Sequence, residues 1–118
     1  MDMTKHYVNG EWVTPLSDKT MVVLNPATEK QIARIVWGND ADVDRAVAAA
    51  NAALKTYSRT TKAERLDLLR RLLAETQNRF EDLAQAISSE MGAPISMARD
   101  AQTDAAVGHL QGFIDALE

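Results

Sequence analysis

Two histidines are the only side chains in this sequence that ordinarily titrate near neutral pH, so they are the first candidates for proton transfer or metal binding. His6 and His109 are far apart in the sequence, and neither stands at metal-ligand spacing from a second histidine. The chain contains no cysteine, which excludes a thiolate nucleophile, a cysteine-based zinc site and a disulfide framework. We therefore expect no catalytic, cofactor-binding or metal-binding residue in this chain.

Paired charges could offer another route to chemistry. Neighbouring carboxylates can share acid–base work, and three acidic pairs have suitable spacing: Asp42/Asp44, Glu81/Asp82 and Asp100/Asp104. Charge near helix N-termini or on solvated helix faces explains these pairs better. Five basic residues gather around one predicted helix start and alternate with Glu64 and Asp67, which indicates a salt-bridged surface: Arg59, Lys62, Arg65, Arg70 and Arg71.

The glycines and the overall charge exclude further classes of function. None of the five glycines forms a phosphate-binding loop between a strand and a helix. Gly108 and Gly112 form a GxxxG pattern, which predicts close helix packing or no role, because no apolar run approaches the ~20 residues of a membrane span. A net charge of −4 argues against a nucleic-acid partner. The first residues lack the apolar region of a signal peptide, so we expect a cytoplasmic protein with no membrane partner.

The elements that position these residues begin with short strands. At 118 residues the chain is long enough for one domain with a modest core. Asn9-Gly10 between two short β-rich pieces predicts a tight hairpin turn. A second strand–turn–strand unit spans residues 21–36, where Asn25-Pro26 interrupts the first apolar run. We read residues 6–36 as three or four short antiparallel strands that need a helical face to pack on.

Helices are predicted for residues 40–117. Asn39 or Asp40 can cap the first helix, whose apolar stripe comprises Val43, Val47, Ala50, Leu54 and Tyr57. Thr61 and Glu64 form a capping box for a helix with Leu66, Leu69, Leu72 and Leu73 at core spacing, bending near Asn78. Gly92 and Pro94 predict a helix end. A last helix runs from about residue 95 to 117 and presents one face: Met97, Ala101, Asp104, Val107, Leu110, Ile114 and Leu117.

The order of several motifs resembles the N-terminus of the aldehyde dehydrogenase superfamily. The first three are residues 7–13 (YVNGEWV), 25–29 (NPATE) and 42–50 (DVDRAVAAA). The leucines that follow Arg65 and the sequence EMGAP at residues 90–94 are also similar. No single motif is specific, but their order and distances together are strong evidence for the resemblance, which covers about residues 6–118.

The resemblance implies an α+β fragment of an α/β aldehyde dehydrogenase fold, with β-ribbon strands at about 6–36 and about four helices at about 40–117. Family members are several times longer and combine a Rossmann-like NAD(P)-binding domain, a catalytic domain and an oligomerisation ribbon. They oxidise aldehydes to carboxylic acids through a cysteine thioester, with a glutamate base and an asparagine that stabilises the oxyanion. All these groups lie downstream of residue 118 in the family, so the nucleotide-binding core and catalytic domain are expected to be absent.

Two features depart from the family pattern, the first bearing on subfamily and the second on a binding site. Many relatives read Gly-Lys-Pro where this chain has Gly92-Ala93-Pro94. In some relatives a structural monovalent cation is bound by a backbone carbonyl and an acidic side chain, and the resemblance places these two ligands at Leu24 and Gln102. Because Gln102 is not acidic, we expect no such site here.

The leading hypothesis is an N-terminal fragment of an aldehyde dehydrogenase that is structural and inactive alone. NAD or NADP is implied for the parent enzyme, and neither is expected to bind this chain. Its partner would be the remainder of the enzyme, with self-association through exposed apolar helix faces. The alternative is a stand-alone helical interaction or oligomerisation module.

Overall fold

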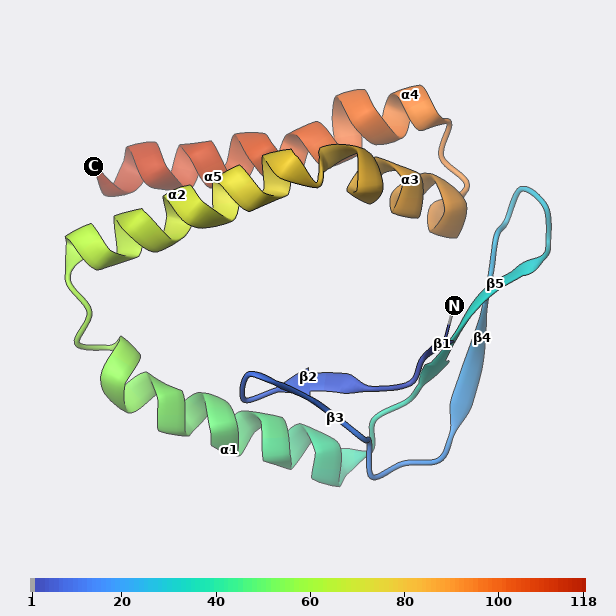
Figure 1. The fold of residues 1–118 in the computed structure, drawn as a ribbon, viewed down its shortest axis with the longest axis horizontal. Helices are drawn as coiled ribbons and strands as arrows, with labels where there is room; N and C mark the ends of the chain where they lie inside the picture. Colours follow the sequence, from blue (N-terminus) through green and yellow to red (C-terminus); the bar gives the residue numbers. More distant parts are fainter. Residues whose placement is uncertain (1) are drawn as a thin grey trace. The chain divides into compact units, whose positions relative to one another are not determined.

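The computed structural model describes residues 2–118, which form two compact units. Unit 1 is Met1–Arg59 and unit 2 is Thr60–Glu118. Unit 1 contains the five strands and the first helix, and unit 2 is helical (Figure 1). The boundary between the units therefore lies after the first helix, although the change from strand to helix comes earlier, between Val36 and Asp40.

The strands of unit 1 form two small sheets. Strands β2 (His6–Val8) and β3 (Glu11–Val13) pair antiparallel, with Val8 opposite Glu11 across the Asn9-Gly10 turn. Both turn residues have positive φ, 54° and 83°, which suits a type I′ hairpin. The predicted Asn-Gly hairpin is therefore confirmed.

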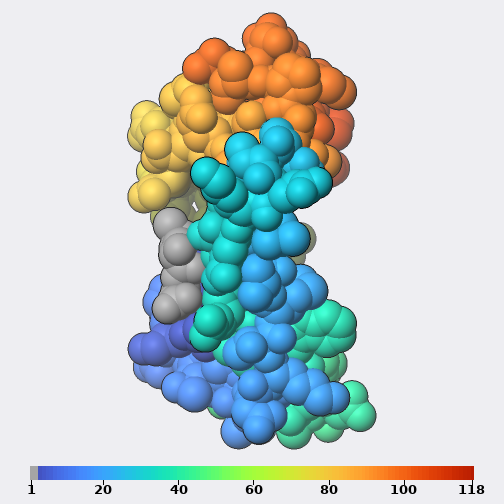
Figure 2. Space-filling model, turned by 90° about the vertical axis from the view of Figure 1, so that its right-hand side faces the viewer, coloured from blue at the N-terminus to red at the C-terminus, as the bar shows by residue number. Residues whose placement is uncertain are grey.

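A second sheet has the strand order β1-β5-β4. Strands β4 (Thr20–Leu24) and β5 (Gln31–Val36) pair antiparallel, and they lie along each other in Figure 2. The two-residue strand β1 (Asp2–Met3) pairs parallel to β5. The antiparallel strands predicted for residues 6–36 are confirmed, and the parallel strand before them was not anticipated, because two residues carry no readable period.

The turn between β4 and β5 is built by Asn25. Its side-chain Oδ1 accepts hydrogen bonds from the backbone N–H groups of Ala27 (2.9 Å) and Thr28 (3.2 Å). Glu29, which has a positive φ of 57°, donates its backbone N–H to the Asn25 carbonyl at 2.7 Å. Pro26 has no backbone N–H to donate to a neighbouring strand, which explains why β4 ends before this residue.

Helix α1 spans Asp40–Tyr57 and packs its small side chains toward the hairpin. Asn39 is the N-cap. Ala46 and Ala49 are half-buried, whereas the predicted apolar stripe is exposed, with Val43 at 59% and Leu54 at 56% exposure. The alanine face packs on β2 because methyl groups allow close approach, and the larger apolar side chains have no covering within unit 1.

Unit 2 consists of α2 (Lys62–Asn78), α3 (Phe80–Met91), α4 (Ile95–Met97), the π-helical segment η1 (Ala98–Thr103) and α5 (Asp104–Leu117). Helix α2 lies alongside α5, and α3 packs on η1 (Figure 1). Counting α4, η1 and α5 as one continuous helix, residues 2–118 contain the four helices that were expected. The bend predicted near Asn78 is a break at Arg79, between α2 and α3.

Helix ends in unit 2 follow the predicted capping chemistry. Thr61 Oγ1 accepts the Glu64 backbone N–H at 3.2 Å, and the Glu64 carboxylate accepts the Thr61 N–H at 2.7 Å. At the end of α3, Gly92 has φ 74° and donates its N–H to the Ser88 carbonyl. A side chain at Gly92 would strain this left-handed conformation, so glycine suits the helix end.

The π turn corrects the predicted core face of the last helix. Met97, Ala101 and Asp104 were expected on that face and are exposed, whereas Ala98 and Thr103 are buried. The inward face runs back from buried Ile114 through half-buried Leu110 and Val107 to buried Thr103, in steps of four, three and four residues. The next buried residue, Ala98, is five residues further back. A π turn adds one residue, so the stripe N-terminal to η1 is out of phase with a regular α-helix.

The core of unit 2 is small. Among the described residues the buried hydrophobic side chains are Leu66, Ala84, Ala98 and Ile114. Leu72, expected in the core, is 50% exposed. In residues 2–118 no helix combines the length and apolar composition needed to cross a membrane.

Replacing Ile114 by alanine should lower the free energy of unfolding by ~2–4 kcal/mol, because the side chain is 3% exposed and its loss leaves a cavity between α5 and α2. Urea denaturation followed by circular dichroism measures this. Phe113→Ala is the matched control: its neighbouring side chain is 64% exposed, and its loss should change stability by less than about 0.5 kcal/mol. Equal losses in both variants would contradict the packing described.

Candidate functional site

The best-connected polar group in unit 1 is the carboxylate of Asp42. It is buried, with 5% exposure, and accepts the Leu16 backbone N–H at 2.9 and 3.2 Å. It also accepts the Asn39 N–H at 3.1 Å, while Asn39 Oδ1 accepts the Asp42 N–H at 3.0 Å. This reciprocal capping box starts α1 and ties the 14–19 loop to it.

Arg45 completes the Asp42 cluster. Its Nη2 lies 3.3 Å from Asp42 Oδ1 and 3.3 Å from the Thr14 carbonyl. Its buried Nε has no hydrogen-bond partner within residues 2–118. The carboxylate thus has a charge partner and three backbone-anchored contacts, which is the arrangement of a structural ion pair.

The cluster fixes the protonation state of Asp42. The Leu16 N–H does most to hold the pKa of the Asp42 carboxyl below its ordinary 3.8; burial opposes this, and Asn39, Arg45 and His6 add to the lowering. The carboxylate is therefore ionised at neutral pH, and it cannot act as a general acid there.

His6 lies beside this cluster and has a structural role. Its Nε2 is 3.1 Å from the carbonyl oxygen of Val36, to which it can donate. A Cβ on Gly38 would stand 3.3 Å from His6 Cε1 and 3.5 Å from Asp42 Cβ. The absence of a side chain at Gly38 lets the end of β5 pass close to both residues.

The other acidic candidates are dispersed. Asp44, Asp82, Asp100 and Asp104 are exposed. Glu81 receives Arg99 Nε at 2.8 Å, Arg99 Nη2 at 2.7 Å and Gln85 Nε2 at 2.8 Å. These bonds, Arg99 first, lower the pKa of Glu81 from 4.5 to about 2 and join α3 to η1.

The basic residues of α2 pair along their own surface. Arg71 Nε donates to Asp67 at 2.9 Å, and Arg65 Nε donates to Thr60 Oγ1 at 2.9 Å. Lys62 Nζ lies 2.7 Å from the Glu118 carbonyl oxygen, and Arg70 pairs with the Glu118 carboxylate. The contacts to Glu118 anchor the end of α5 to α2, and the predicted salt-bridged surface is confirmed at the ion pairs Arg70–Glu118 and Arg71–Asp67.

The remaining candidates lie apart. His109 is exposed on α5, and a Cβ added at Gly108 or Gly112 would meet nothing within 4 Å. Leu24 belongs to β4 in unit 1 and Gln102 to η1 in unit 2. Within residues 2–118, the Gln102 Oε1 and Thr103 Oγ1 atoms are buried without a hydrogen-bond partner, and no group of three His, Asp or Glu side chains is arranged to hold a metal ion.

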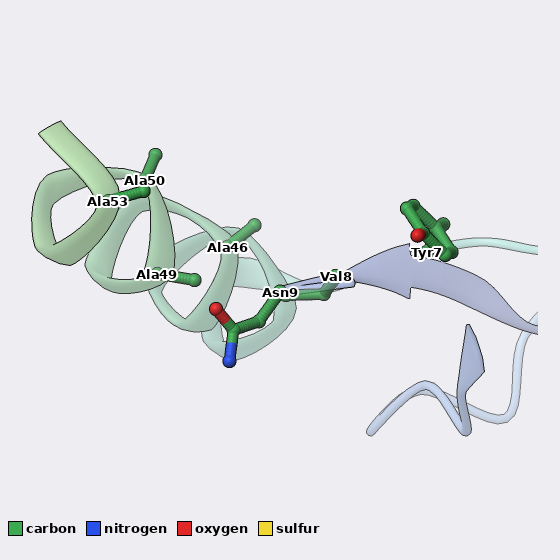
Figure 3. Close-up of a pocket in the computed structure, with 7 residues that line it drawn as sticks. All are labelled: Tyr7, Val8, Asn9, Ala46, Ala49, Ala50 and Ala53. Atoms are coloured by element: carbon green, nitrogen blue, oxygen red, sulfur yellow. The ribbon is translucent and has the colours of Figure 1, made fainter. Parts of the chain in front are cut away.

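A shallow apolar pocket of about 250 Å³ lies between the hairpin and α1 (Figure 3). The alanines of α1 form one wall and the end of β2 the other; the lining residues are Tyr7, Val8, Asn9, Ala46, Ala49, Ala50 and Ala53. Sequence reasoning did not anticipate this pocket, because its walls come from separate elements.

Exposed apolar side chains are widespread. They occur on both units of the described chain, for example Trp12 and Trp37 at 61% and 55% exposure. The rings of Tyr7 and Trp12 contact each other across the hairpin, with centroids 5.2 Å apart and ring planes tilted by 60°. Large uncovered apolar areas of this kind are typical of surfaces that contact other polypeptide.

Asp42→Asn should lower the melting temperature at neutral pH by about 5 °C, since the amide cannot replace the ionised acceptor of Leu16 and Arg45. The pKa of Asp42 is lowered in the folded chain, so its stabilisation is present above 3.8 and is lost as the pH falls below that value. The variant should therefore show a weaker loss of stability in acid. Melting curves between neutral pH and pH 3 test this against Asp44→Asn, an exposed neighbour; the same curve for both variants would contradict it.

The chain is similar to known aldehyde dehydrogenases over most of its length. The sequence model of the aldehyde dehydrogenase family matches residues 12–118. A curated Staphylococcus aureus relative, whose name places it among the aldehyde dehydrogenases, is 43% identical over 99% of this chain. The chain spans 25% of that relative's length.

Solved structures of aldehyde dehydrogenases are also similar to this chain. An aldehyde dehydrogenase from Bartonella henselae superposes with a TM-score of 0.97 at 38% identity, covering 99% of this chain and 25% of that one. Aldehyde dehydrogenase C of Pseudomonas syringae, a mutant in complex with NAD+ and octanal, gives 0.94 at 46% identity, covering 97% and 24%. These matches agree with the ordered motifs and with the order of strands and helices. The chain therefore belongs to the aldehyde dehydrogenase family.

Proposed function

We propose that this chain is the N-terminal structural part of an enzyme that oxidises an aldehyde to a carboxylic acid with NAD or NADP. The observation that carries the proposal is the match of nearly the whole chain to about one quarter of longer family members. The Pseudomonas syringae structure, which holds NAD+ and octanal, supports the reaction class. The cytoplasmic location expected from the sequence stays a prediction.

The segment contributes architecture in this proposal. Unit 1 presents the exposed stripe of α1, and unit 2 presents Leu68, Leu72 and Phe113. Burying an apolar side chain gains ~1.5–3 kcal/mol, so the remainder of the enzyme would be stabilised by covering these faces. The chemistry would reside in that remainder, because covalent aldehyde oxidation in this family needs a cysteine and this chain has none.

A chimera tests the proposed role. The N-terminal quarter of the Pseudomonas syringae enzyme is exchanged for this chain, and the active-site cysteine of that enzyme is kept intact. The chimera should oxidise octanal with NAD+ at a rate within about tenfold of the parent enzyme's. A tenfold loss of rate corresponds to a barrier raised by ~1.4 kcal/mol. Reduction of NAD+ followed by absorbance measures the rate.

Two controls accompany the chimera. The 118-residue chain alone should reduce neither NAD+ nor NADP+ with any aldehyde tested, and the enzyme lacking its N-terminal quarter should not fold. A chimera that folds and binds NAD+ like the parent enzyme yet oxidises no aldehyde would contradict the proposal, as would turnover by the isolated chain.

Isolated from its partner polypeptide, the chain should self-associate through its uncovered apolar faces. Size-exclusion chromatography with light scattering should show a mass that rises with concentration. Val43→Ser combined with Val47→Ser should reduce the association, since both side chains lie on the exposed α1 stripe at 59% and 52% exposure. Ala48→Ser with Ala52→Ser, on the same helix, is the control. A dilution-independent monomer would contradict this expectation, whereas a single defined oligomer would favour the interaction-module alternative.

A further inference from the structure

We propose that Asn9 is a site of spontaneous covalent modification, deamidation to aspartate and isoaspartate, built into the hairpin turn. The reaction needs an asparagine whose side-chain carbon can be reached by the backbone nitrogen of the next residue. It is fastest where that next residue is small, where neither group is held by hydrogen bonds and where water has access. These requirements can be checked at each asparagine of the chain.

Asn9 precedes the smallest residue, Gly10, and is exposed to water. A Cβ added at Gly10 would find nothing within 4 Å, so no neighbouring group crowds the turn on that side. The ladder joins Val8 to Glu11 and skips the turn, and within residues 2–118 neither the Asn9 carboxamide nor the Gly10 N–H has a hydrogen-bond partner. The flanking strands have three residues each, so the turn is free to open briefly.

The other four asparagines each lack a requirement. Asn25 precedes Pro26, which has no N–H, and its Oδ1 holds two backbone donors. Asn39 Oδ1 accepts the Asp42 N–H. Asn51 lies within α1 and Asn78 ends α2, both before residues with side chains. The predicted reactivity of Asn9 therefore comes from its place in the hairpin turn, because the other asparagines of the same chain lack that environment.

The reaction proceeds without an enzyme. The Gly10 nitrogen gives its proton to solvent and attacks Cγ of Asn9; the new N–Cγ bond forms, the Cγ–Nδ2 bond breaks, and ammonia leaves. Water then adds to either carbonyl of the five-membered imide and breaks its bond to nitrogen. One direction yields aspartate and the other isoaspartate.

The two products differ in their effect on the hairpin. Aspartate tolerates positive φ and keeps the turn, while adding one negative charge. Isoaspartate places an additional methylene in the main chain, so a two-residue turn no longer matches Val8 to Glu11. The Tyr7–Trp12 ring contact and the pocket against the α1 alanines both depend on that register.

The test incubates the 118-residue chain at neutral and mildly alkaline pH and follows its peptides by mass spectrometry. Deamidation replaces one NH by one O, and an isoaspartyl methyltransferase labels the isoaspartate product. The Asn9 peptide should convert severalfold faster than any other asparagine peptide, and faster at the higher pH. An intact Asn9, or another asparagine converting as quickly, would overturn the proposal.

Two variants distinguish the effect of the turn conformation from that of the Asn-Gly sequence and test how each product affects the hairpin. Ala52→Gly gives Asn51 a glycine neighbour inside α1, where the backbone is hydrogen-bonded, and Asn51 should still convert severalfold more slowly than Asn9; equal rates would overturn the role of the turn. Asn9→Asp represents the aspartate product and should keep the near-ultraviolet circular dichroism of the Tyr7–Trp12 pair. The purified isoaspartate form should lose that signal, and its retention would refute the effect on the hairpin.

Discussion

The scarcity of buried apolar side chains is the constraint on which the rest of this structure depends. The buried hydrophobic residues among the described ones, such as Leu66 and Ile114, all belong to unit 2. In unit 1 the buried residues among the described ones are Pro15 and Asp42. With so little apolar burial, unit 1 depends strongly on backbone hydrogen bonds and on the Asp42 carboxylate. The hydrogen bonds of that carboxylate are strengthened by its buried, charge-paired setting.

The same constraint connects architecture to function. Exposing the apolar stripe of α1 to water is unfavourable in free energy. A family member about four times as long contains further polypeptide that could bury such a stripe. Alanines face the hairpin, and larger apolar residues face outward. This division assigns one face of α1 to local packing and leaves the other for the proposed remainder of the enzyme.

Local chemistry explains which elements could be predicted. The Asn9-Gly10 hairpin, the Thr61 capping box and the Gly92 helix end depend on residues within four positions of one another, and each was predicted correctly. The π turn was missed because it forms where α3 packs on η1, and a period of five over one turn cannot be recognised in a sequence. Only the N-terminal part of the predicted face was consequently wrong: Met97, Ala101 and Asp104 are exposed, whereas Ala98 and Thr103 are buried.

By itself the sequence determined the element order, the caps, the absence of a cysteine nucleophile and the resemblance to aldehyde dehydrogenases, because all these follow from residue type and short spacing. Tertiary structure alone decided that Asp42 would be buried, that Leu16 and Arg45 would meet it, and that the Val43 stripe would stay uncovered. The physical reason is that burial and charge pairing depend on contacts between residues far apart in the chain. Asp42 and Asp44 have the same side chain and lie two residues apart, and only packing distinguishes them.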